Sequence, residues 1–83
     1  NKMSAALLAM ADVSFQKESY LRARAFLQRY EAVAPVTPES LDLGIAIESA
    51  LGDEETAERY RIMLREDFPD VIRARERAVE RER

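Results

Sequence analysis

The side chains that most often carry enzyme chemistry are missing from this chain. Its 83 residues include neither histidine nor cysteine, so the commonest general base, metal ligand and thiolate nucleophile are absent. The serines therefore have no histidine to activate them, which excludes the usual catalytic triad. These serines are Ser4, Ser14, Ser19, Ser40 and Ser49.

Carboxylates are the remaining groups that could act as acids, bases or ligands. Two clusters, 53–55 and 66–67, lie at the expected starts and ends of helices, where acids usually act as solvated caps. A glycosidase-type site would instead hold two carboxylates opposite each other in a cleft. The spacing of a calcium-binding loop is also absent. We therefore expect a protein that is not an enzyme and that uses no metal and no cofactor.

Arginine is abundant, with eleven residues, but it is balanced by acids. Residues 71–83 carry five arginines against three glutamates, and residues 39–70 carry ten acids against three arginines. A phosphate backbone would be repelled by the acidic segment, so we expect no nucleic-acid binding. No run of about 18 apolar residues occurs that could span a membrane.

One separation along the chain recurs between residues of similar type. The pairs are Leu7 with Leu41, Ala23 with Ala57, Phe26 with Tyr60, and Pro35 with Pro69. Their common separation is 34 residues, and we call it the repeat period. It is the period of the tetratricopeptide repeat, a helix–turn–helix unit that stacks into a solenoid. Glu48 and Arg61 occupy positions of the second unit where the repeat favours aromatic residues. An unrelated helical bundle is therefore the alternative.

Apolar residues recur at helical spacing over residues 4–16, 20–33, 38–51 and 54–68, and a charged helix follows at about 70–82. We expect an all-α, tetratricopeptide-like, right-handed stack in one domain, residues 4–83. Its first repeat would span 4–37, its second 38–71, and the last helix would cap the stack. Packing between repeats is assigned to Leu7, Ala11, Ala23, Pro35, Leu41, Ala57 and Pro69. In the third helix we expect Leu41, Ile45 and Ala50 to be buried.

The first helix of each repeat would line the concave face, which such repeats use to bind a peptide or helix. The register places an apolar anchor there, surrounded by acids that would repel a carboxylate. The candidate partner-binding residues are Leu8, Asp12, Phe15, Glu39, Asp42 and Ala46. The residues alone leave open whether Leu8 and Phe15 bind a partner or pack against a neighbouring repeat.

Several segments resemble one known family. They are 6–13 and 20–24 in the first half, and 40–45, 53–57 and 67–69 in the second. Together they are similar to the C-terminal repeats of type IV pilus biogenesis/stability proteins, the PilF/PilW-like pilotin lipoproteins. The resemblance implies a scaffold that helps the pilus secretin assemble at the periplasmic face of the bacterial outer membrane. Its membrane contact would be only a lipid anchor outside this chain. A generic tetratricopeptide adaptor is the alternative function.

The first helix also offers an apolar edge on which a preceding repeat would pack. We expect Leu8, Phe15 and the intervening alanines to be exposed there. Leaving a few hundred Å² of apolar surface in water costs several kcal/mol at about 25 cal/mol/Å². Pairing two edges about a two-fold axis recovers much of that cost. We therefore expect self-association of this chain through its first helix.

Overall fold

The computed structural model describes residues 1–82, which form five α-helices and, within that range, no β-strand. The prediction of an all-helical fold is confirmed. The largest difference in bounds is at the first helix, which begins at Lys2 rather than Ser4. The helices are α1 (Lys2–Gln16), α2 (Tyr20–Val33), α3 (Pro38–Leu51), α4 (Glu54–Asp67) and α5 (Pro69–Arg81).

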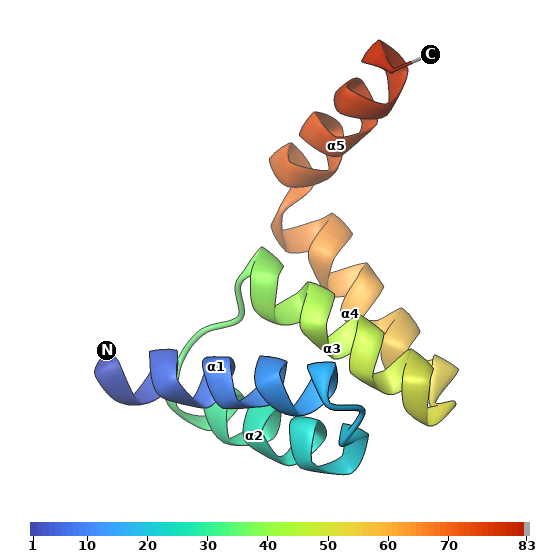
Figure 1. Ribbon diagram of the computed structural model, residues 1–83. Helices are drawn as coiled ribbons and strands as arrows, with labels where there is room; N and C mark the ends of the chain where they lie inside the picture. The colour runs from blue at the N-terminus through green and yellow to red at the C-terminus, as the bar shows by residue number, and fades with distance from the viewer. Residues whose placement is uncertain (83) are drawn as a thin grey trace.

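The helices pack as adjacent antiparallel pairs. α1 packs on α2, α3 packs on α4, and the two pairs meet mainly through α2 and α3 (Figure 1). Shifting the bounds of α2 by one repeat period gives the bounds of α4, since Tyr20 becomes Glu54 and Val33 becomes Asp67. This arrangement is consistent with a helical repeat.

Side-chain caps determine where α1 and α3 begin. The Asn1 side chain accepts a hydrogen bond of 2.8 Å from the backbone N–H of Ser4. In return, the Ser4 hydroxyl accepts a hydrogen bond from the backbone nitrogen of Asn1. Ser4 is thus the third residue of α1 and not its start, because this reciprocal capping box extends the helix back to Lys2. Thr37 and Ser40 form the same motif at α3.

The core cluster joins α1 and α2 to α3. It consists of Ala11, Ala23, Leu27, Tyr30 and Ile47. Ala23 and Ala57, the two alanines separated by one repeat period, are both 0% exposed, so helices cross closely there.

The packing of α3 differs in part from the prediction. Leu41 is buried, but Ile45 is only half-buried and Ala50 is exposed. Ile47 is buried instead, because α3 packs against α2 as well as against α4, and this second contact uses another face of the helix. The expectation for Ala50 was therefore wrong.

Two of the expected packing residues, Pro35 and Pro69, are exposed. Each instead follows a helix end: α2 ends at Val33 and α4 ends at Asp67. This is the usual effect of proline, which disfavours helical geometry at the preceding residue. Leu7 is half-buried and packs against the core cluster.

α5 extends away from the two pairs and does not cover the end of the stack (Figure 1). It contains no buried residue, and only Val71 and Ile72 in its first turns are half-buried. The capping helix therefore forms at the expected place, but it does not pack as a cap. Phe68 alone separates it from α4, which leaves no chain for it to fold back.

The outer side of the second pair is already polar without α5. Arg61 stands one repeat period after the buried Leu27. Its guanidinium lies 3.5 Å from a carboxylate oxygen of Glu54 and 3.6 Å from one of Glu58. A charged network thus replaces an apolar contact at this end of the stack.

The turn within each helix pair contains one residue in the left-handed region, Glu18 (φ 60°) and Gly52 (φ 80°), which are again separated by one repeat period. This region costs an L-residue about 1–2 kcal/mol, whereas glycine adopts it readily. A Cβ added at Gly52 would meet no atom within 4 Å, so only backbone strain would oppose it.

We expect Gly52→Ala to lower the free energy of unfolding by about 1 kcal/mol. Glu18→Gly should leave it unchanged or raise it by up to about 1 kcal/mol, because the flexibility of glycine in the unfolded chain offsets part of the relieved strain. Urea denaturation of both variants measures the difference. An equal decrease in the free energy of unfolding in both variants would contradict a left-handed Glu18.

Candidate functional site

A groove of about 260 Å³ runs between α1 and α3. The structure brings five of the six predicted partner-binding residues together in its lining. These five are Leu8, Asp12 and Phe15 from α1, and Glu39 and Asp42 from α3. The sixth, Ala46, is half-buried on α3 and does not line the groove. We call this surface the α1–α3 groove.

The floor of the α1–α3 groove is apolar and its rim is acidic. Leu8 and Phe15 are half-buried and pack against the core cluster. The Phe15 ring lies 5.5 Å from that of Tyr20, centroid to centroid, so its position is held from α2. Asp12 and Glu39 are exposed, and within residues 1–82 neither forms an ion pair.

The third carboxylate of the rim, Asp42, is paired with α5. Its two oxygens accept hydrogen bonds of 3.1 and 2.7 Å from Nη1 and Nη2 of Arg75. The same hydrogen bonds raise the pKa of Arg75. The rim is therefore less acidic than its sequence suggests, and α5 contributes to it. The sequence reasoning missed this pair because the repeat register does not place α5.

The α1–α3 groove combines an apolar floor with two exposed carboxylates. An apolar floor accepts an apolar side chain, and the exposed carboxylates of Asp12 and Glu39 favour a nearby cation. In the described part of the chain, no three aspartate or glutamate side chains gather closely enough to hold a metal ion.

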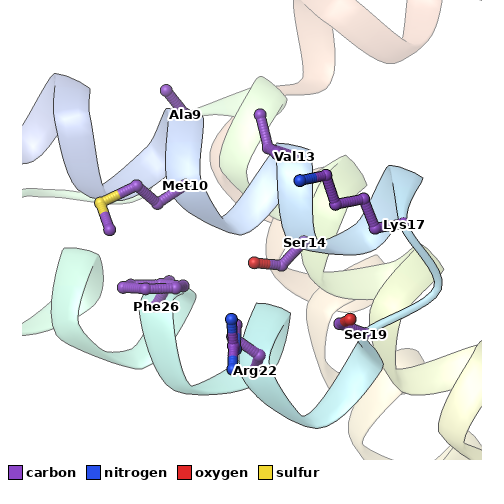
Figure 2. A pocket seen from close by; sticks show the side chains of 8 residues that line it. All are labelled: Ala9, Met10, Val13, Ser14, Lys17, Ser19, Arg22 and Phe26. Carbon is purple, nitrogen blue, oxygen red and sulfur yellow. The ribbon is translucent and has the colours of Figure 1, made fainter.

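A second groove, of about 320 Å³, lies on the opposite side of the first pair, between α1 and α2. Figure 2 shows Met10 and Phe26 facing each other across it, with Lys17 and Arg22 nearer its other end. Val13, from α1, is 51% exposed, and Met10 is 46% exposed. We call this surface the α1–α2 groove.

The α1–α2 groove corrects the expected apolar edge of the first helix. Leu8 and Phe15, which were expected to be exposed there, line the α1–α3 groove and pack on the core. The exposed large apolar side chains of α1 that line the α1–α2 groove are Met10 and Val13. The repeat period could have identified them, because their counterparts Gly44 and Ile47 are both buried.

Polar contacts between the two pairs were also missed. Glu48 is only 3% exposed, and its carboxylate accepts hydrogen bonds of 3.1 and 2.6 Å from Nε and Nη2 of Arg24. This contact raises the pKa of Arg24. Glu48 stands at a position where the repeat favours an aromatic residue. It instead joins α2 to α3.

The hydroxyl of Tyr60 makes a second polar contact between the pairs, donating a hydrogen bond of 2.9 Å to Oε2 of Glu31. Burial raises the pKa of Glu31 above its ordinary value of 4.5, and the hydrogen bond from Tyr60 opposes this increase. Burial also raises the pKa of Tyr60. Tyr60 therefore remains a neutral donor at physiological pH.

Glu31→Gln is expected to flatten the pH dependence of stability just above pH 4.5. A carboxyl group whose pKa is raised by folding stabilises the protein below its unfolded pKa, and this contribution is lost as the pH rises through the folded pKa. Glutamine keeps an acceptor for Tyr60 but does not titrate. Urea denaturation at pH 4 and pH 7 measures the change. As the pH rises from 4 to 7, the free energy of unfolding should lose less in the variant than in the parent. An unchanged loss would contradict the assigned role of Glu31.

Comparison of this chain with family models, curated proteins and solved structures gave no match. Among residues 1–82, no helix is long and apolar enough to cross a membrane.

Proposed function

We propose that this chain is a non-enzymatic protein-binding module of tetratricopeptide type and that the α1–α3 groove is its binding surface. The observation that carries the proposal is the gathering of Leu8 and Phe15 beneath Asp12 and Glu39 in one groove. The matching bounds of α2 and α4, offset by one repeat period, support the repeat assignment.

The partner that fits this groove is a peptide or helix with an apolar anchor beside a lysine or arginine. The anchor covers the apolar floor, and the cation lies near the rim carboxylates. A C-terminal carboxylate is disfavoured because Asp12 and Glu39 would repel it.

The biological setting we propose is type IV pilus assembly at the periplasmic face of the bacterial outer membrane. The partner would be the pilus secretin or another assembly component. The similarity of residues 6–13 and 40–45 to PilF/PilW-like pilotins supports this setting. A generic adaptor domain with the same groove is the second candidate, since the groove itself does not depend on the pilus.

The double variant Asp12→Lys/Glu39→Lys is expected to weaken partner binding about tenfold, because two attractive rim charges become repulsive. The measurement is capture of the solubilised secretin by the immobilised chain. Arg59→Ala is the matched control, since Arg59 is exposed on α4 outside the groove. Undiminished capture by the double variant would contradict the assignment of the groove.

Deletion of the parent gene separates the two candidates. The pilus setting predicts loss of secretin multimers and of twitching motility, with rescue by the Arg59→Ala form but not by the Asp12→Lys/Glu39→Lys form. Normal multimers in the deletion strain would remove the pilus setting and leave the adaptor.

A further inference from the structure

We propose that the α1–α2 groove binds an amphipathic α-helix whose apolar stripe is flanked by glutamate or aspartate. The partner helix would pack on the first pair as α2 packs on α3 of the second pair. This surface is separate from the α1–α3 groove, so the inference goes beyond the function proposed above.

The internal repeat shows what this face of a helix pair does. Each residue lining the α1–α2 groove has a counterpart one repeat period later, and in the second pair Ile47, Glu48 and Tyr60 among these counterparts contact α2. Leu43, Ile47 and Leu51 belong to the apolar packing around the core cluster. Glu48 binds Arg24, and Tyr60 binds Glu31. The corresponding residues of the first pair are Ala9, Val13, Lys17, Ser14 and Phe26.

The centre of the face stays apolar in the first pair, although Lys17 stands at the position of Leu51. Met10 and Val13 from α1 and Phe26 from α2 surround the groove (Figure 2). Their combined surface can cover a central leucine, which is the role of Leu27 of α2 on the second pair, where Leu27 is 1% exposed. The apolar lining of the groove therefore suits the apolar stripe of a helix.

The charge of the face is reversed between the two pairs. The second pair presents the buried Glu48 and the nearby Asp53 to the cation of Arg24. In the first pair Ser14 replaces Glu48, and the charged residues of the lining are Lys17 and Arg22, with no carboxylate. Arg29 adds a further cation, since its guanidinium lies 5.8 Å from the centroid of the Phe26 ring. The complementary helix therefore carries acids on its flanks.

The cations also argue against a second copy of this chain as the occupant. In a two-fold pairing through the α1–α2 groove, Lys17 and Arg22 of both copies would be brought into one interface. Like charges placed together disfavour such an interface. Self-association through the first helix is consequently an outcome that the experiment must separate from binding of an acidic helix.

The probe is a pair of synthetic helical peptides of 14 residues, the length of α2. Both carry the same leucine stripe, and their flanks carry either glutamate or lysine. Fluorescence anisotropy with the labelled peptides should give a Kd about tenfold lower for the glutamate form. Lys17→Glu/Arg22→Glu is expected to reverse this preference, and Val13→Glu is expected to abolish binding of both forms.

Two controls locate the site. Asp12→Lys alters the α1–α3 groove. The Kd of the glutamate peptide for this variant should stay within about twofold of its Kd for the parent chain. Amide chemical shifts should change along α1 and α2 on addition of the peptide. Equal binding of the two peptides, a preference that survives the charge reversal, or shifts confined to the α1–α3 groove would each overturn the proposal. A dimer in sedimentation that Val13→Glu dissociates would also overturn it, since a second copy would then occupy the face.

Discussion

Arg24→Met is expected to lower the free energy of unfolding by about 3 kcal/mol, because it leaves a buried carboxylate without its partner. Glu48 is 3% exposed and receives both hydrogen bonds from one guanidinium. Methionine keeps most of the apolar stem of arginine. The decrease in the free energy of unfolding therefore comes mainly from the missing charge. Urea denaturation at neutral pH measures the change.

The double variant Arg24→Met/Glu48→Met separates the strength of the pair from the cost of an unpaired charge. Replacing both partners of a buried ion pair with apolar residues is often close to neutral, so the double variant should be more stable than Arg24→Met alone. Arg59→Ala is the control, because its exposed pair with Glu55 contributes less than about 1 kcal/mol. A loss for Arg24→Met no larger than that of the control would show that Glu48 is solvated without Arg24.

Ala57→Leu is expected to lower the free energy of unfolding by about 1–3 kcal/mol through overpacking. Ala57 is 0% exposed where α4 crosses its neighbour, and three added carbon atoms would force the helices apart. Ala32→Leu is the matched control, since Ala32 is exposed on α2 and the same change adds no atoms to the core. Urea denaturation of Ala57→Leu that matched the parent would show that the second pair is not closely packed at this alanine.

The helices were predictable because their signals are local. The spacing of apolar residues, the prolines after α2 and α4, and Thr37 before Pro38 each act within a few positions along the chain. The start of α1 was misplaced by the same local rules. Ser4 was read as the beginning of the helix, whereas the reciprocal hydrogen bonds with Asn1 place it in the first turn.

The faces of the helices were harder to predict because they depend on where neighbouring helices lie. Leu8 and Phe15 share a face with Asp12, and periodicity cannot say whether that face meets solvent, α3 or another repeat. The structure places it beside α3 and leaves Met10 and Val13 exposed on another side.

Contacts between charged residues far apart in the chain were not predictable from their types. Glu48 and Arg24 each resemble ordinary surface residues in the sequence, and only the packing of α2 on α3 makes them partners. Arg75 could not be matched with Asp42 for a similar reason, since the direction of α5 is set at Phe68 and not by the register of the repeat.

The polar outer side of the second pair has a consequence for growth of the stack by copies of the chain. Head-to-tail contact would place α4 of one molecule on the α1–α2 groove of the next, with Arg61 where Leu27 packs in the first pair. The guanidinium of Arg61 would then have to leave water and its contacts with Glu54 and Glu58. Repeated head-to-tail contacts that do not close produce open fibres. Arg61 therefore protects a chain with one exposed apolar end from polymerising into filaments.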